Sequence, residues 1–265
     1  MSVIVRFENL TKVYRLPGFL KSREVVGIHD LNLEIEEGEV FGLLGLNGSG
    51  KTTTIRLMLG LIAASAGRAL VLGREAAKDS GVRSHLGYLP ENATLPPALT
   101  PVEFLRFLGR IDRNKFPDRA KLQRRIHHVL KIVGLEQAAD RKISSFSKGM
   151  TQRLGIAQAI LHEPKLLVLD EPASGLDPLG IVEMRELFLK LNKELGMTVV
   201  FSSHSIGEVE KVSHRAAIVT GNCLQRLLMR KDWDGSGKTS LEKHFLECAQ
   251  TLYSQQLGRE VKLDD

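Results

Sequence analysis

Gly45-Leu46-Asn47-Gly48-Ser49-Gly50-Lys51-Thr52 is the stretch that decides the fold, because it fits the pattern G-x-x-x-x-G-K-[ST] at every fixed position. The apolar residues of 39–44 before it predict a buried strand, and residues 53–59 after it predict a helix. A strand, a glycine-rich loop and a helix in this order are typical of the phosphate-binding loop of an α/β nucleotide-binding fold.

The residue types in this loop suit a triphosphate. Without a Cβ, the glycines at 45, 48 and 50 allow the backbone to turn several N–H groups toward one anion. The N-terminus of the following helix adds unpaired N–H groups and the positive end of its dipole. We therefore expect Lys51 to contact the β- and γ-phosphates and the hydroxyl of Thr52 to ligate Mg²⁺.

The end of the same motif recurs in Gly235-Ser236-Gly237-Lys238-Thr239, but its context is wrong. Asp232 stands at the position of the first glycine, and residues 230–234 are too polar for a buried strand. We predict a solvated loop here and no second nucleotide site.

Composition sets the broad class. The chain has 265 residues, enough for one large α/β domain or two small ones. Its two cysteines are too few for a disulfide framework or a cysteine metal site, which suits a reducing compartment. The most apolar stretch, 57–67, is shorter than the roughly 20 residues of a membrane span, and residues 1–6 do not resemble a secretion signal. We expect a cytosolic protein whose membrane role requires a partner chain.

The formal charge of +6 favours anionic surfaces without naming one. The densest basic run is 119–125, and apolar residues continue from it at helical spacing. We interpret the run as a solvated helix face, with a contact surface as the alternative. No aromatic residues interleave with these charges, which argues against nucleic acid as a direct partner.

The segment Leu166-Leu167-Val168-Leu169-Asp170-Glu171 narrows the class of protein, because a phosphate loop alone is shared by kinases, GTPases, helicases and transport ATPases. Four apolar residues predict a fully buried strand, and two carboxylates follow at its carboxyl end, where ligands bind in open α/β sheets. We expect Asp170 to hold Mg²⁺, and Glu171 to orient or deprotonate an attacking water.

Another strand is predicted at 197–203, and His204 follows it at the same edge of the sheet as the two carboxylates. An imidazole there can hydrogen-bond a γ-phosphate and the attacking water, although a histidine after a strand is more often structural. The loop 172–178 lies between the carboxylates and a helix predicted at 179–194.

A largely helical insertion is predicted at 92–163, and it contains Ser147 before an amphipathic helix. A helix N-terminus with a serine hydroxyl and the backbone of Gly149 is a second candidate anion site. Taken alone, the same pattern is also an ordinary N-cap.

In this order, the motifs of residues 1–220 resemble the nucleotide-binding subunit of an ABC transporter. The resemblance implies an α/β fold: a phosphate-loop NTPase core of mainly parallel sheet, an N-terminal antiparallel β subdomain and an inserted α-helical subdomain at 92–163. Residues 221–265 would be a C-terminal extension, helical at 241–257. The segments 86–91 and 240–246 look like the exporter branch of the family.

Residue roles follow from this resemblance. Tyr14 would stack on adenine, Gly45 to Thr53 would bind the phosphates of ATP, and Glu91 would be a further Mg²⁺ ligand. The signature motif Ser147-Lys148-Gly149-Met150 would bind the γ-phosphate through Ser147 and Gly149. Asp177 belongs to the loop that crosses the dimer interface. His204 matches the switch histidine that acts in catalysis beside Glu171 and Lys51.

Four residues depart from the commonest pattern. The family usually carries Leu-Ser-Gly-Gly-Gln, whereas this chain has Phe146-Ser147-Lys148-Gly149-Met150, and many relatives have glutamine where Glu91 stands. If position 148 needs a positive φ, Lys148 would be strained there; if it does not, its ammonium would add charge near the γ-phosphate. We expect the anion site to survive.

The resemblance also implies partners. Two such domains, identical or closely related, would meet head to tail with ATP between the phosphate loop of one and the signature helix of the other, and a separate integral membrane subunit would carry the cargo, which the sequence does not identify. One alternative is a soluble ABC ATPase acting on nucleic acid or ribosomes, although no internal repeat or heptad pattern favours it. The other is a nucleotide-binding module with little hydrolysis, because of Lys148 and Glu91.

Overall fold

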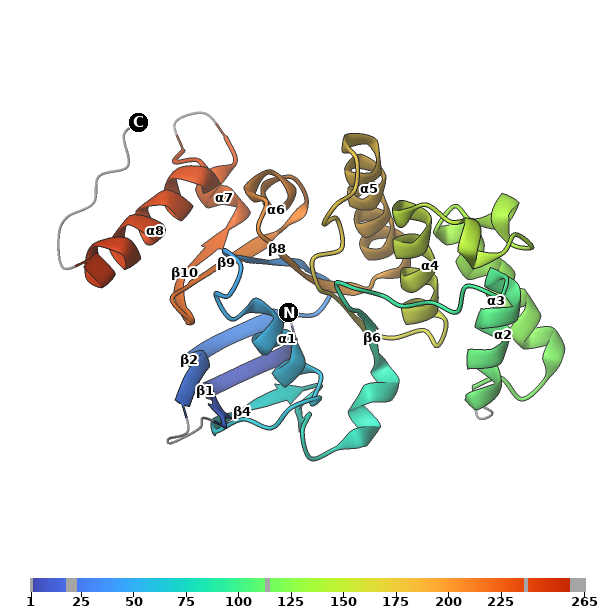
Figure 1. The fold of residues 1–265 in the computed structure, drawn as a ribbon, viewed down its shortest axis with the longest axis horizontal. Coiled ribbons are helices and arrows are strands. Elements are labelled where there is room, and N and C mark those ends of the chain that lie inside the picture. The colour runs from blue at the N-terminus through green and yellow to red at the C-terminus, as the bar shows by residue number, and fades with distance from the viewer. Residues whose placement is uncertain (1, 18–22, 113–114, 236–237, 258–265) are drawn as a thin grey trace. The chain divides into compact units, whose positions relative to one another are not determined.

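The computed structural model describes residues 2–17, 23–112, 115–235 and 238–257 (Figure 1). The chain forms two compact units, one made of residues 1–82 and 200–265 and the other of residues 83–199. Each unit is described by itself. The predicted phosphate loop belongs to the first unit, and the predicted carboxylates and signature helix belong to the second.

An antiparallel sheet opens the first unit. Its strands are β1 (Val3–Leu16), β2 (Arg23–Glu36), β4 (Ala66–Val71) and β5 (Arg74–Glu75), in the order β2-β1-β4-β5. Phe7 of β1 lies opposite Leu33 of β2 and Ala69 of β4, and all three side chains are buried. Since the period of a strand is two, these positions fix one apolar face of the sheet and confirm the predicted antiparallel subdomain.

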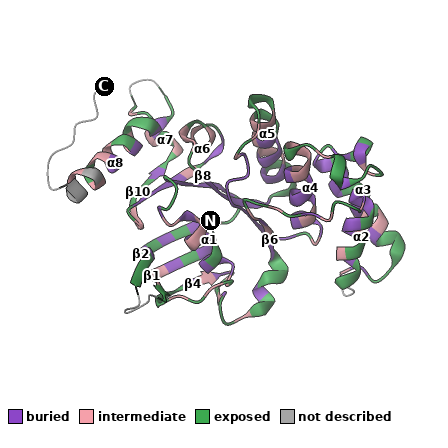
Figure 2. Ribbon diagram, in the orientation of Figure 1, coloured by how far each residue is buried: buried purple, intermediate pink, exposed green. Residues whose placement is uncertain are grey.

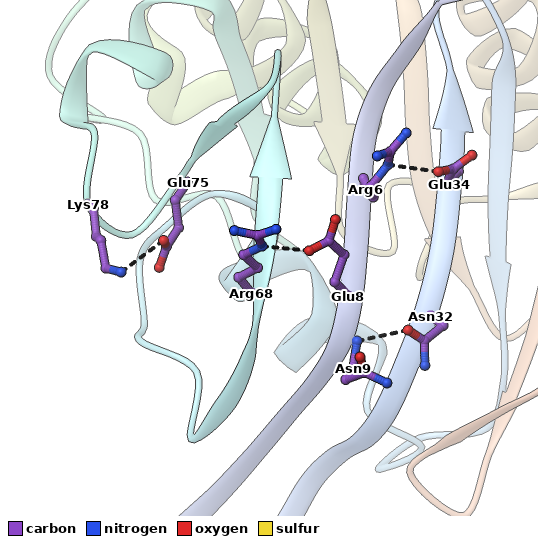
Figure 3. A network of polar contacts seen from close by, with 8 residues as sticks. All are labelled: Arg6, Glu8, Asn9, Asn32, Glu34, Arg68, Glu75 and Lys78. Atoms are coloured by element: carbon purple, nitrogen blue, oxygen red, sulfur yellow. Dashed lines mark hydrogen bonds and ion pairs between the residues drawn. The ribbon is translucent and has the colours of Figure 1, made fainter.

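The other face of this sheet carries cross-strand polar pairs (Figure 3). Arg6 contacts Glu34 at 2.7 Å, Arg68 contacts Glu8 at 2.5 Å, and the backbone N–H of Asn9 donates to the side chain of Asn32. These side chains are about a third to a half exposed, so solvent screens the ion pairs and each contributes little to stability. They mainly favour the observed strand register.

A second sheet of the first unit, with both parallel and antiparallel strand pairs, holds the phosphate loop. Its strands have the order β10-β9-β3-β8, with β3 at Val40–Leu44, β8 at Thr198–Ser203, β9 at Arg215–Thr220 and β10 at Cys223–Met229. Every residue of β3 is buried, as its apolar sequence predicts. The helices of this unit are α1 (Lys51–Met58), α6 (Ile206–Val212), α7 (Arg230–Trp233) and α8 (Leu241–Leu257).

The second unit combines a short parallel strand pair with the helical insertion. Strands β6 (Leu86–Leu89) and β7 (Leu166–Leu169) pair in parallel, and β7 is fully buried as predicted. The helices are α2 (Pro101–Ile111), α3 (Arg119–Ile132), α4 (Lys148–Ile160) and α5 (Pro178–Leu195), with single 3₁₀ turns at Glu136–Ala138 and Ile143–Ser145. Figure 2 shows buried and exposed residues interleaved along these helices, as amphipathic patterns require.

Side-chain caps begin all four helices of the second unit. Thr100 forms a capping box with Glu103 at α2, and Asp118, Ser147 and Asp177 accept backbone N–H groups at α3, α4 and α5. Among the described residues, no helix is long and apolar enough to cross a membrane.

Candidate functional site: a phosphate loop, buried carboxylates and a signature helix

The phosphate loop of the first unit has the backbone geometry of an anion nest. Gly48 has φ +80° and Gly50 has φ +106°, a region that side chains disfavour. A Cβ on Gly50 would lie 2.4 Å from the carbonyl oxygen of Gly27, so only glycine fits there. The amide of Asn222 donates to the carbonyls of Gly27 and Gly48, at 3.0 and 3.2 Å. Asn222 therefore holds the loop in place, a role that the sequence pattern does not reveal.

Lys51 is the first residue of α1 and is only 5% exposed. Its Nζ donates to the carbonyls of Gly45 and Leu46, at 2.6 and 3.2 Å, so the ammonium lies on the loop itself. The hydroxyl of Ser49 is buried without a hydrogen-bond partner among the described residues. A concave loop of this kind, with a cation on it and a spare buried hydroxyl, fits a bound phosphate chain.

Tyr14 lies beside the helix that follows the loop. Its hydroxyl is 3.3 Å from Oγ1 of Thr53, and the Nζ of Lys12 is 5.3 Å from the centroid of its ring. A Cβ on Gly27 would lie 2.7 Å from the Tyr14 ring, so the glycine leaves space for the aromatic side chain. The structure thus brings the predicted adenine-stacking residue to the phosphate loop.

His204 is also adjacent to the loop. The N–H of Gly45 donates to the carbonyl of Ser203 at 3.2 Å, which joins the start of the loop to the end of β8. The hydroxyl of Ser203 donates to Glu208 at 2.8 Å and accepts from the N–H of Ser205 at 2.9 Å. The turn is therefore fixed, and His204 extends from it as an exposed side chain.

In the second unit, the two predicted carboxylates follow the buried strand β7. Asp170 is 2% exposed and Glu171 is 7% exposed. The N–H of Asp170 donates to the carbonyl of Leu89 at 2.9 Å, which places the end of β7 beside the end of β6. Glu171 has φ +47°, an unusual conformation for a side-chain-bearing residue and one that clusters at functional sites.

Glu91 follows β6 on the same side of this unit. Its side chain is exposed, and its backbone carbonyl accepts from the amide of Gln152 in α4 at 3.4 Å. This bond ties the segment after β6 to the signature helix. Among the described residues, no group of three or more His, Cys, Asp or Glu side chains could hold a metal ion by itself.

The signature motif begins α4 as the sequence predicts. The hydroxyl of Ser147 accepts from the N–H of Met150 at 3.2 Å, so Ser147 is the N-cap. Lys148 is a helical residue and is not among those with positive φ, so the alternative of a strained Lys148 is wrong. Its ammonium lies against Gly175, and Gly149 lies close to the side chain of Leu176.

Asp177 ends the loop that follows Glu171. Its Oδ1 accepts from the N–H of Gly180 at 2.7 Å, which makes it the N-cap of α5. In this chain the carboxylate therefore stabilises the helix start, and any role across a dimer interface would rest on the loop backbone or on a change of partner.

The basic run of 119–125 is mostly solvated, with one exception. Arg119, Lys121 and Arg124 are exposed, whereas the Arg125 side chain is only 12% exposed and donates to the carbonyls of Ile160 and Leu161. The interpretation of the run as a solvated face is thus wrong for Arg125, because its guanidinium closes the last turn of α4.

A cavity of about 850 Å³ lies between α2 and α3. Arg106, Arg110 and Arg119 line it together with Phe116 and Leu122. On the outer side of α2, Phe107 is 61% exposed and Ile111 is 70% exposed. Residues 101–132 contain nine Lys and Arg but three Asp and Glu, so this segment accounts for the whole formal excess of +6.

The residues before the repeated motif at 235–239 do not form the strand that precedes a phosphate loop. Arg230–Trp233 before it form the short helix α7, not a strand, which confirms that the context of a phosphate loop is missing. Ser236 and Gly237 lie outside the described residues.

The fold and these motifs define a phosphate-loop nucleotide-binding protein of the α/β class. Comparison with known proteins identifies the family: the model described as "ABC transporter" matches residues 28–174, and the chain belongs to that family. An uncharacterized ABC transporter ATP-binding protein of Synechocystis sp. is 42% identical over 82% of this chain. The match spans 60% of that relative, which is less than two thirds of its length.

Two further similarities extend this result. The bacitracin transport ATP-binding protein BcrA of Bacillus licheniformis is 39% identical over 86% of this chain and 70% of its own length. The ATP-binding cassette MJ0796, solved as a dimer in a post-hydrolysis state with ADP and Pi, has a TM-score of 0.76. It is 26% identical, covering 85% of this chain and 98% of that one. The α/β fold of an ABC ATPase is thereby established.

Proposed function

We propose that this chain is the ATP-binding and ATP-hydrolysing subunit of a membrane transporter. The observation that carries the proposal is the glycine nest with the Lys51 ammonium on its carbonyls, joined through Gly45 to the end of the strand that precedes His204. Kinases and GTPases share the nest but not the capped signature helix at Ser147. The relative named for bacitracin transport supports a role in transport, although the substrate of this chain is unidentified.

In this proposal the residues divide the work of hydrolysis. Lys51 and the backbone of the loop bind and orient the phosphates, and the ring of Tyr14 stacks on adenine. Thr52, Asp170 and Glu91 would supply oxygen ligands for Mg²⁺, which neutralises phosphate charge when bound. Glu171 orients or deprotonates the attacking water, and His204 donates a hydrogen bond toward the γ-phosphate.

The working state would be a dimer, with either a second copy or a close relative. Ser147 and Gly149 of one protomer would bind the γ-phosphate held by Lys51 of the other. A ligand must prefer the closed state by roughly 5 kcal/mol to change a mostly open population into a mostly closed one. A few charge-assisted hydrogen bonds to the γ-phosphate can provide this preference, and hydrolysis removes it.

The membrane partner would be a separate integral subunit, and this chain would act at the cytoplasmic face of the membrane. The cavity between α2 and α3 is the surface that suits an acidic segment of that partner. Three arginines line it, and exposed Phe107 and Ile111 lie on the same helix as Arg106 and Arg110. Charge attraction and apolar burial would then act together.

The test compares wild type with the Glu171→Gln variant. Glutamine has nearly the same shape as glutamate, so ATP binding should persist. Turnover should fall at least about 100-fold, because the variant lacks the general base. The variant should also remain a dimer in gel filtration with Mg²⁺ and ATP, and return to a monomer with ADP. Equal turnover would remove Glu171 from this role. If wild type binds ATP but does not hydrolyse it, either alone or with its membrane partner, the protein is a nucleotide-binding module and not an ATPase.

A further inference from the structure

The ammonium of Lys148 lies where a side chain of Gly175 would project. A Cβ built on Gly175 would be 2.3 Å from Nζ of Lys148, 3.4 Å from Cε and 3.7 Å from Cδ. Gly175 has φ +68°, a backbone conformation that glycine adopts without strain. Because glycine has no side chain, the space beside it is open to the lysine. The end of the Lys148 side chain therefore covers the middle of the loop 172–177, within the second unit.

Two neighbouring contacts also connect α4 with the loop 172–177 and with α5. A Cβ on Gly149 would be 3.8 Å from Cδ2 of Leu176, the next residue of the loop. Arg153, farther along α4, forms an ion pair of 3.4 Å with Glu183 in α5. The signature helix α4 is thus packed along the loop and the helix that follows it.

The loop is also tied to Glu171. The N–H of Ser174 donates to the carbonyl of Glu171 at 3.1 Å, and the N–H of Leu176 donates to the carbonyl of Ala173 at 3.2 Å. Asp177 fixes the far end through its cap on α5. Gly175 lies between the two residues tied by these N–H groups, and it is the residue that Lys148 covers.

Helix stability does not account for a lysine at this position. Lys148 is the first residue of α4, where the positive end of the helix dipole disfavours a cation. No acidic residue lies in the first turn, and none of the ion pairs found in the described part of the chain includes Lys148. The contact of its side chain with Gly175 can offset this unfavourable interaction with the helix dipole.

We propose that Lys148 is a positioning residue: its side chain holds the loop 172–177 against the signature helix and, through the bond from Ser174, keeps Glu171 aligned for water attack. The inference rests on the proposed ATPase function. It replaces the idea that the ammonium adds charge at the γ-phosphate with a packing role inside one protomer. Loss of the contact between Lys148 and Gly175 should lower kcat and not ATP affinity, because ATP binding to the phosphate loop does not involve this contact.

Variants at position 148 separate packing from charge. In Lys148→Gly the loop loses its cover, and we expect kcat for ATP hydrolysis to fall about tenfold or more, since small misalignments of reacting groups are costly. Lys148→Met keeps a long side chain without charge, and Lys148→Arg keeps both properties, so each should stay within about threefold of the wild-type kcat. KM should be unchanged in all three, and the melting temperature should stay within about 4 °C of wild type.

A double-mutant cycle with Gly175→Ala tests the contact itself. The added methyl group would displace the lysine, and its backbone strain is the same with or without Lys148. We therefore expect Gly175→Ala to lower kcat less in the Lys148→Gly background than in wild type. Additive effects, or equal losses in Lys148→Met and Lys148→Gly, would overturn the proposal. An inactive wild type would instead refute the ATPase function on which it rests.

Discussion

The backbone N–H of Gly45 donates a hydrogen bond of 3.2 Å to the carbonyl of Ser203, so the first glycine of the phosphate loop and the residue before His204 are directly connected. The Ser203 hydroxyl is held by Glu208 and Ser205, which leaves little freedom to the turn. The backbone of His204 must therefore move with the loop. Its exposed side chain lies at the end of this fixed turn, next to the phosphate loop.

We predict that His204→Ala lowers ATP turnover by about 100-fold, the usual size of a lost proton-transfer or hydrogen-bonding group. ATP affinity should change little, because the Lys51 ammonium and the glycine nest remain. Phosphate release and binding of a fluorescent ATP analogue measure the two quantities separately. His128→Ala, at an exposed position of α3, is the matched control and should leave both unchanged. Loss of binding without loss of kcat would contradict this role.

Lys51→Ala and Lys238→Ala form a matched pair, because both lysines follow a Gly-Ser-Gly sequence. The Lys51 ammonium lies on the loop carbonyls of Gly45 and Leu46, whereas Lys238 is exposed after the short helix α7. A charge-assisted contact is worth about 1.5–3 kcal/mol, so Lys51→Ala should weaken ATP binding about 10- to 100-fold or more. Calorimetric titration should find no change for Lys238→Ala. Equal losses of ATP affinity in the two variants would show that a lysine after Gly-Ser-Gly can bind ATP without a strand before the loop.

The sequence predicts the elements that carry local patterns. The apolar runs at 40–44 and 166–169 became buried strands, and Ser147 became a cap, because each depends on a few neighbouring residues. The antiparallel subdomain was predicted from the family resemblance and not from the periodicity of the sequence. Its strands are confirmed, with register shifts along β1 that no local pattern encodes.

The contacts that the sequence could not predict join residues far apart in the chain. Asn222 supports the phosphate loop from 174 positions beyond Gly48. Lys148 meets Gly175, and Arg125 reaches the end of α4, although nothing in the basic run distinguishes it from exposed Arg124. Such pairs arise from tertiary packing, in which one turn of a helix decides whether a charge is solvated or bonded.

Reversing charge at the α2–α3 cavity should weaken the proposed attachment to a membrane partner. We expect the double variant Arg110→Glu with Arg119→Glu to keep its fold and ATP binding, because both side chains are exposed. Co-purification with the partner from membranes should drop, and more steeply at low salt, since screening is weaker there. Arg124→Glu with Lys131→Glu on the same helix is the control for net charge. Equal retention of the two double variants would place the docking surface elsewhere.

Stability of the chain should decline on mild acidification because of His162. Its Nε2 is 2.9 Å from the carbonyl of Leu86, so the neutral ring donates this bond. Burial lowers the pKa of His162 from the ordinary 6.5, the charges of Lys115 and Arg125 lower it further, and the Leu86 bond and Asp112 raise it in part. The unfolded chain therefore takes up a proton near pH 6.5 while the folded chain does so only at lower pH.

The free energy of unfolding should accordingly fall as the pH drops through 6.5 and level off below the lowered pKa, by at most about 1.4 kcal/mol per pH unit for this group. His162→Gln offers an amide N–H to Leu86 without a titrating proton, so it should lose less stability between pH 7.5 and 5.5. Melting temperatures across this range check the difference, with His128→Gln as the exposed control. Parallel curves for wild type and His162→Gln would mean that His162 is protonated as readily in the folded chain as in the unfolded one.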